Sequence, residues 1–354
     1  MTKLLPIQGE RYGQNWNYEG LHLIAKGAFG QIYKAKLIEP GNSLNADFIA
    51  LKVVHFKNEE VLSDESAREK MRKRFQRLLE IKHHCLVVYH QITIDSTTSP
   101  TSFTVHLLME NCSGGDLAGR LQKVKATRTN ARSNLPARIT LDLRTAVCYA
   151  QQIAEGLQCL HRNCIIHGDL KPGNVLIRVV RDEAGIQEQL VIGDLDDFIQ
   201  MQNNTTCSKD VSTTHTCGTL RYMSPEMHWK MSQTPTVSPG RKVDIWSLGC
   251  IMLEMVNCIL GIDQLWLRNV KSSADKKRGD NVEDYSYALL VCAGYVPIVP
   301  KETPAAFADC ICRCLSFPSE QRPRAAEVME MLHDPDVLHK MQSATSDSCK
   351  CSLV

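Results

Sequence analysis

The pattern of apolar residues changes once along the chain, and this change limits the folds that the sequence can adopt. Residues 19–37 alternate apolar and polar side chains around a glycine-containing segment, which predicts two strands joined by a turn. Strand-forming residues predict further strands at 48–56, 86–94 and 103–110. From about residue 140 the apolar spacing becomes helical, most clearly over 145–163. We therefore expect a small sheet-rich part followed by a larger, mostly helical part.

One helix is predicted inside the sheet-rich part, over residues 63–82, because Met71, Phe75 and Leu78 would share one face of it. The segment 111–117, "NCSGGDL", reads as the connector between the two parts. Residues 121–139 carry mixed charges and are expected to loop out in part.

The net charge and the N-terminal residues argue against a nucleic-acid partner and against a secreted or membrane-spanning protein. The net charge of the 354 residues is only +2, so no global field favours nucleic acid, and we expect no nucleic-acid partner. The first residues, "MTKLLPIQGERYG", contain no long apolar run, which predicts neither a signal peptide nor a membrane span. These patterns favour a cytoplasmic protein.

The chain has 15 cysteines, an odd number, and most of them fall in apolar segments. Reduced cytosolic thiols explain this better than a disulfide framework. The run "CICRC" at 310–314 suggests a zinc site at first sight. Helical spacing would point Cys312 away from Cys310 and Cys314, so core packing is the favoured interpretation. His83 and His84 are likewise interpreted as part of a turn and not as metal ligands.

The stretch "HGDLKPGN" at 167–174 carries an acid, a cation and an amide on one short loop. Transfer of a phosphoryl group from a nucleotide requires positioned charge more than covalent help. Asp169 can orient a substrate hydroxyl and accept its proton, and Lys171 can stabilise charge on the moving group. Asn174 offers a neutral oxygen to Mg²⁺, and Asp194, at the end of an apolar strand, offers a second oxygen ligand.

Seven motifs in a fixed order give the chain a resemblance to the eukaryotic protein kinases. They are "AKGAFGQI", "IALKV", "HGDLKPGN", "GDLD", "GTLRYMSPE", "DIWSLG" and "EQRPRA". The resemblance covers roughly residues 18–333 and favours the Ser/Thr type. It implies an α+β, two-lobed fold with a sheet-rich lobe at 18–111, which has one main helix, and a mostly helical lobe at 112–333. Residues 1–17 then form an extension and residues 334–354 a tail.

The same resemblance implies which residues bind ATP. Glycine-rich-loop residues would close over the phosphates, Ile32 and Ala50 would contact adenine, and Lys52 would hold the α- and β-phosphates. Met109 falls at the gatekeeper position. The backbones of Glu110 and Cys112 would hydrogen-bond adenine. The remaining candidates are Ala25, Gly27 and Gly30 in the loop and Asp116 at the ribose.

Structural residues of the family also have counterparts in this chain. Glu226 is expected to pair with Arg322, and Asp244 is expected to brace the catalytic loop. Thr219 is expected to help shape the peptide-binding loop. These matches support the fold and not the activity.

Several positions depart from the family pattern. Ala25 replaces the first loop glycine, and Asp196 replaces the glycine after the metal-binding acid. Gly168 replaces an arginine that reads a phosphate on the activation segment, so we do not expect that segment to switch by this route.

The helix residue that should pair with Lys52 is ambiguous. Counting forward from Lys52 selects Glu69, whereas counting back from "HHCLV" selects Arg74. Two cations about 4 Å apart would repel by about 4 kcal/mol at an effective dielectric constant near 20. Either Glu69 pairs with Lys52 through a shifted helix, or Lys52 has no partner on this helix; the second alternative is slightly favoured.

The function implied by the resemblance is ATP- and Mg²⁺-dependent phosphorylation of serine or threonine hydroxyls on protein substrates. The alternative is a pseudokinase, a folded scaffold that binds nucleotide or other proteins without catalysis.

The C-terminal "CKCSLV" allows two exclusive interpretations. Cys351 in a prenylation-like position, with Cys349 as a palmitate acceptor, would attach the protein to a membrane. Alternatively, Val354 would be the terminal residue of a PDZ ligand. An unrecognised, disordered tail is the third possibility.

Overall fold

The structure is a computed structural model of the chain. The described residues are 10–13, 16–26, 30–38, 48–57, 65–99, 102–129, 140–182, 185–202, 206–207, 220–231, 240–262 and 289–333. The chain divides into two compact units. The first unit comprises Met1–Gly114 with Arg178–Glu188, and the second comprises Gly115–Ile177 with Gln189–Val354.

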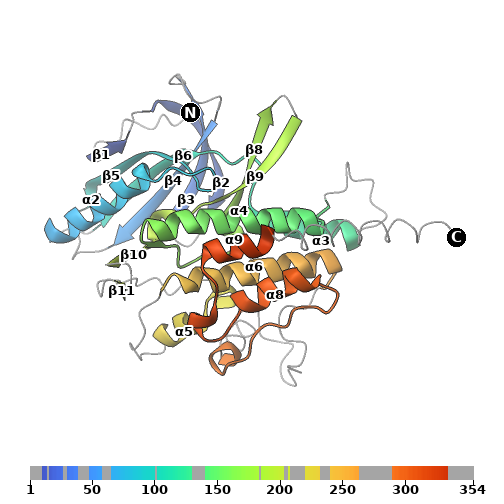
Figure 1. Cartoon of the computed structure of the whole chain (residues 1–354). Coiled ribbons are helices and arrows are strands. Elements are labelled where there is room, and N and C mark those ends of the chain that lie inside the picture. The colour runs from blue at the N-terminus through green and yellow to red at the C-terminus, as the bar shows by residue number, and fades with distance from the viewer. Residues whose placement is uncertain are drawn as a thin grey trace, which may run out of the picture. The chain divides into compact units, whose positions relative to one another are not determined.

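The first unit is built on a six-stranded antiparallel sheet with the strand order β1-β5-β6-β4-β3-β2 (Figure 1). Its strands are β1 (Glu10–Gly13), β2 (Tyr18–Lys26), β3 (Gly30–Leu37), β4 (Phe48–Lys57), β5 (Tyr89–Ser99) and β6 (Ser102–Glu110). β4 is rich in β-branched and aromatic residues and lies between β3 and β6. The expected sheet-rich first part is confirmed.

Helix α2 (Glu65–Glu80) is the predicted helix of this unit. Its buried stripe includes Phe75 and Leu78, three residues apart, and the helix contacts β1 and β5 (Figure 1). Nine of its sixteen residues are charged, which explains why only a narrow stripe is buried.

Part of the expected N-terminal extension, residues 10–13, is a strand of the sheet. They form β1 and pair with β5, from Glu10 opposite Ile94 to Gly13 opposite Gln91. Trp16, just after this strand, donates its backbone N–H to Gln91 Oε1 at 3.1 Å, and its ring lies 5.0 Å from the ring of His90. The N-terminal segment therefore belongs to the sheet, since the edge of β5 offers it backbone partners.

The second unit is mostly helical (Figure 1). Its longer helices are α3 (Leu117–Thr129), α4 (Leu143–Arg162), α6 (Lys242–Leu260), α8 (Ala305–Cys314) and α9 (Ala325–His333). Its short elements are β7 (Ile165–Ile166), β10 (Ile199–Gln202), β11 (Thr206–Cys207), α5 (Pro225–Met231) and the 3-10 turns Pro172–Asn174, Leu195–Asp197, Leu220–Tyr222 and Ser319–Gln321. The hairpin strands β8 (Val175–Asp182) and β9 (Gly185–Ile192) begin and end in it.

Helix α6 forms the centre of this unit. It contacts α3, α4 and α8, and α4 in turn contacts α9. By length and hydropathy α6 could cross a membrane, but 83% of its apolar window is buried inside the protein. That burial is typical of the core helix of a folded domain.

Two smaller expectations can be compared with these elements. The segment 121–139 does not loop out at its start, because α3 continues to Thr129, and residues 130–139 lie outside the described part. In α8, Cys310 and Cys314 are buried and Cys312 is exposed, as the packing interpretation of "CICRC" requires. Cys349, Cys351 and Val354 lie outside the described residues, so lipid attachment and PDZ binding stay predictions.

Candidate active site

One face of the first unit's sheet collects four of the ten residues assigned to ATP binding. Residues opposite one another in antiparallel strands project to the same face. Lys52 lies opposite Ile32, and Ala50 lies opposite Met109. Lys52 and Ala50 are two residues apart on β4 and therefore share that face. Ala50, Lys52 and Met109 are all buried.

The glycine-rich loop is described only at its two ends. Ala25 on β2 pairs with Ile32 on β3, directly after a register shift between Leu23 and Ala25, so the alanine is accommodated within the strand pair. Gly30 begins β3, and a Cβ atom at this position would collide with the backbone carbonyl of Val53. Gly30 is therefore needed for close strand packing, independently of any phosphate. Gly27 lies outside the described residues.

Strand β6 ends at Glu110, where the family resemblance places the adenine contacts. The Glu110 N–H donates to the Val88 carbonyl at 3.0 Å, so this N–H is already used within the protein. Burial, followed by the nearby Glu110 charge, raises the pKa of the Cys112 thiol to about 12. Cys112 stays protonated at neutral pH, so it can offer its backbone but not a thiolate nucleophile.

Helix α2 does not direct Glu69 at Lys52. The Glu69 carboxylate pairs with Arg72 at 3.7 Å and with Lys73 at 3.5 Å, both on its own helix, and 49% of its side chain is exposed. Arg74 is half-buried on the stripe that also carries Phe75. These contacts argue against the first alternative, in which Glu69 pairs with Lys52.

In the second unit, Asp169, Lys171 and Asn174 converge on one loop. Lys171 Nζ donates to Asp169 Oδ2 at 2.7 Å. Asn174 Nδ2 donates to the Asp169 carbonyl at 2.7 Å and to Asp169 Oδ2 at 3.3 Å. Asn174 is buried, whereas a third of the Asp169 side chain is exposed. One carboxylate oxygen is thus fixed by a cation and an amide, and a substrate can reach the acid.

The buried carboxylate of Asp244 anchors the backbone of this loop. Asp244, on α6, accepts hydrogen bonds from the His167 N–H at 3.0 Å, the Gly168 N–H at 2.9 Å and His161 Nε2 at 2.8 Å. Burial alone would raise the pKa of Asp244, but the His161 hydrogen bond, the charges of His161 and His167 and the Gly168 N–H lower it overall. Asp244 is therefore ionised, and the expected brace of the catalytic loop is confirmed.

Gly168 occupies the position where the family has arginine. Its φ is +78°, a left-handed conformation that favours glycine, and a Cβ would lie 3.1 Å from Ile199 Cδ1. Its N–H still binds Asp244, so the loss of the arginine side chain leaves the backbone of the loop intact.

Asp194 is positioned by the residue before it. The Gly193 N–H donates to the Asn174 carbonyl at 2.8 Å, and the Gly193 carbonyl bonds His167 Nε2 at 2.9 Å. Asp194 itself has φ +59°, which is uncommon outside glycine and is found preferentially at functional sites. The motif analysis did not predict this role of His167; a histidine directly before the Gly-Asp pair is the only signal for it.

The carboxylate of Asp116 has a structural role. Its Oδ1 accepts the Gly119 N–H at 2.7 Å, which caps the first turn of α3. Asp116 Oδ1 is thereby used as the helix cap, and the contact between Asp116 and the ribose stays a prediction.

The Glu226–Arg322 pair is confirmed. Arg322 Nη1 and Nη2 donate to Glu226 Oε1 and Oε2 at 2.6 and 2.9 Å, and the arginine side chain is fully buried against the ring of Trp246. Thr219 lies outside the described residues.

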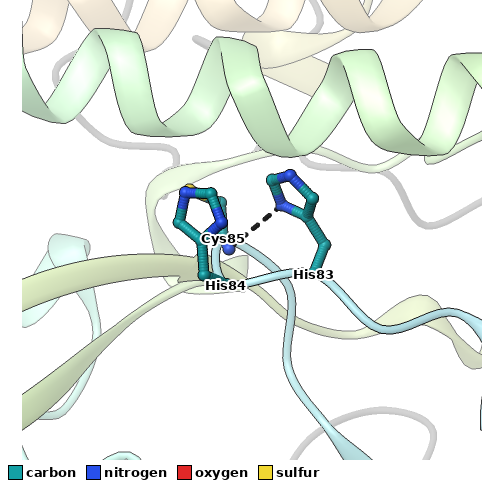
Figure 2. Close-up of side chains that lie close together, drawn as sticks. All are labelled: His83, His84 and Cys85. Carbon is teal, nitrogen blue, oxygen red and sulfur yellow. Dashed lines mark hydrogen bonds between the residues drawn. The ribbon is translucent and has the colours of Figure 1, made fainter.

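One cluster outside these motifs could hold a metal ion by distance alone. The donor atoms of His83, His84 and Cys85 lie within 4.8 Å of one another (Figure 2). However, His83 Nδ1 accepts the Cys85 N–H at 3.2 Å, so the proton of a neutral ring is on Nε2. Neither nitrogen of the His83 ring then keeps a lone pair for a metal, which supports the interpretation of this segment as a turn.

Comparison with known proteins agrees with these features. A family model described as "Protein kinase domain" matches residues 18–333. Mouse serine/threonine-protein kinase Nek2 is 26% identical over 315 residues, covering 89% of this chain and 59% of the relative. Human mitogen-activated protein kinase kinase kinase 3 is 28% identical over 242 residues, covering 68% and 32%.

A plant relative aligns over more of the chain. Arabidopsis thaliana serine/threonine-protein kinase TOUSLED is 28% identical over 343 residues, covering 95% of this chain and 43% of the relative. The chain therefore spans less than two thirds of the length of these curated relatives.

Proposed function

Because the chain belongs to the protein kinase family, we propose that it transfers the terminal phosphoryl group of ATP to serine or threonine hydroxyls of protein substrates. The observation that carries this proposal is the bonding of Lys171 and Asn174 to Asp169 at 2.7 Å. A pseudokinase needs no such arrangement around an accessible acid.

The residues of the loop divide the chemistry between them. Asp169 accepts a hydrogen bond from the substrate hydroxyl and takes its proton as the oxygen attacks phosphorus and ADP leaves. Lys171, already beside Asp169, places a positive charge where the transferred group becomes most negative. Lys52 is assigned to the α- and β-phosphates in the first unit.

The donor set fits Mg²⁺, a hard cation that prefers oxygen ligands. The Asn174 amide donates through Nδ2 to Asp169, so its oxygen is the end available to an ion. Asp194 follows Gly193, whose backbone is bonded to Asn174 and His167. The ion would neutralise charge on the nucleotide phosphates, with Asn174 and Asp194 as its protein ligands.

The hydroxyl class is inferred from sequence. The segments "DLKP" and "GT" favour serine and threonine, and the names of two relatives describe serine/threonine-protein kinases. Because the chain spans only part of those relatives, their substrates are not transferred to it.

Phosphotransfer from radiolabelled ATP to casein and myelin basic protein tests the proposal. Replacing Asp169 with asparagine should lower the rate about 100-fold or more, since the proton acceptor is lost. The surface variant Asp309→Asn is the matched control and should retain the wild-type rate. Equal rates for wild type and Asp169→Asn would refute the enzyme function.

A specific observation also favours the alternative, a pseudokinase scaffold: the Glu69 carboxylate is used in surface ion pairs. An ATP-dependent rise in melting temperature distinguishes the two functions. If the rise needs Mg²⁺ and is absent in Asp194→Ala while wild type transfers no phosphate, the protein binds nucleotide as a pseudokinase.

A further inference from the structure

The side chain of Arg178, which the proposed chemistry does not use, makes four hydrogen bonds to described residues. It lies on β8, at the point where the chain enters the first unit. Its Nε donates to Glu110 Oε2 at 2.8 Å, and its Nη2 donates to Glu110 Oε1 at 2.5 Å. The same guanidinium donates to the carbonyls of His84 at 2.6 Å and Leu86 at 3.2 Å. We call these four hydrogen bonds the Arg178 clamp.

The clamp fixes the side chain of Glu110 from two directions. Glu110 Oε1 also accepts the Val88 N–H at 2.9 Å, while the Glu110 N–H donates back to the Val88 carbonyl. Burial alone would lower the pKa of Arg178, but the hydrogen bond and charge of Glu110 raise it overall. A bidentate pair that is more than four-fifths buried is stronger and less screened than a surface pair. The end of β6 is thus tied to the 84–88 turn and to β8.

The connector that follows Glu110 is paired with β8 as well. The Ile177 N–H donates to the Gly115 carbonyl at 2.8 Å, and Asp116 forms a bridge with Leu176. Residues 176–177 therefore run antiparallel to residues 115–116, and the side chain of the next residue of β8 forms the Arg178 clamp. The conformation of Glu110–Cys112 depends on β8 and not only on its own sheet.

We propose that Arg178 is a positioning residue for nucleotide binding, because it fixes the backbone of Glu110 and Cys112 in the geometry that binds adenine. This inference rests on the proposed function, in which these main-chain groups hydrogen-bond the base. If loss of the clamp leaves only about a tenth of the molecules with a competent backbone, the apparent dissociation constant for ATP rises about tenfold.

Isothermal titration with MgATP and steady-state kinetics test the role. Arg178→Met removes all four hydrogen bonds and keeps an apolar stem, and Glu110→Gln removes the charge of the partner. Each should raise the dissociation constant and the KM for ATP about tenfold. The KM for the protein substrate and kcat should stay unchanged, which a general loss of structure would not allow. The matched control is Arg313→Met, which breaks an exposed pair with Asp309 on α8.

Coupling between the two residues gives a second readout. If both act through the clamp, the double variant should bind ATP no more weakly than either single variant. Arg178→Lys keeps the charge but not the planar guanidinium, so its affinity for ATP should lie between those of Arg178→Met and wild type. This variant also tests the role if Arg178→Met does not fold.

Amide hydrogen exchange of the nucleotide-free protein separates this inference from the proposed function. Loss of the clamp should speed exchange at Val88 and Glu110, whose N–H groups lie beside it. Wild-type ATP affinity in Arg178→Met, or additive effects in the double variant, would overturn the positioning role. Absence of ATP binding by the wild type would instead overturn the proposed function, while faster exchange in the variant would still establish the clamp.

Discussion

Replacing Asp244 with asparagine should destabilise the protein, because no asparagine rotamer can satisfy the donors that surround this carboxylate. Its two oxygens accept hydrogen bonds from His167 N–H, Gly168 N–H and His161 Nε2. An asparagine keeps one acceptor oxygen and turns its amide N–H₂ towards at least one donor. A hydrogen bond to a charged group contributes about 1.5–3 kcal/mol, and the bonds that remain lose their charge assistance. We therefore expect a loss of about 3 kcal/mol in the free energy of unfolding.

Urea unfolding followed by tryptophan fluorescence measures this loss, since Trp246, two residues along α6, is fully buried in the folded protein. The control is Asp309→Asn, which breaks an exposed ion pair with Arg313 and should cost about 0.5 kcal/mol or less. If both variants lose the same small amount, the buried carboxylate does not hold the catalytic loop and the reasoning fails.

The same carboxylate predicts a dependence on pH. The pKa of Asp244 is lower in the folded protein than its ordinary value of about 3.9. Its contribution is therefore complete above that value and is lost as the pH falls towards the lower folded-state pKa. The difference in stability between wild type and Asp244→Asn should be constant near neutral pH and shrink below about pH 4.

Two glycine substitutions test the backbone arguments. Gly13→Ala should destabilise the protein by about 1–3 kcal/mol more than Gly20→Ala. Both glycines have positive φ, but only at Gly13 would the new Cβ lie 2.5 Å from a carbonyl oxygen, that of His90. Equal melting temperatures for these two variants would argue against the packing of β1 on β5. Gly168→Ala should cost about 1–2 kcal/mol because of its φ of +78°, whereas Gly173→Ala, with open space around it, should cost less than about 0.5 kcal/mol in denaturant unfolding.

The fold was predictable because its signals are local. The alternation of residues 19–37 and the helical spacing of 145–163 follow from the geometry of single strands and helices, and both elements formed where the patterns placed them. The order of seven motifs fixed the family. Strand β1 was missed because "ERYG" shows no alternation, and only the open edge of β5 makes a strand of it.

The residues of the catalytic loop were predictable from the sequence, whereas the Arg178 clamp was not. The loop acid, cation and amide lie within six residues, so their proximity is nearly dictated by the chain. The Arg178 clamp was not predictable, because an arginine within "VLIRVV" is separated from Glu110 by 68 residues and belongs to no motif.

The amino-acid sequence by itself determined the family, the two-part organisation and the identity of the loop residues, because these depend on residue type and on short spacings. Only the tertiary structure decided which way each side chain faces. Packing of Phe75 and Leu78 sets the rotation of α2, and that rotation leaves 49% of the Glu69 side chain exposed, where it pairs with Arg72 and Lys73 of the same helix. No count of residues along the chain could give that result, because the rotation of a helix depends on the surface against which it packs.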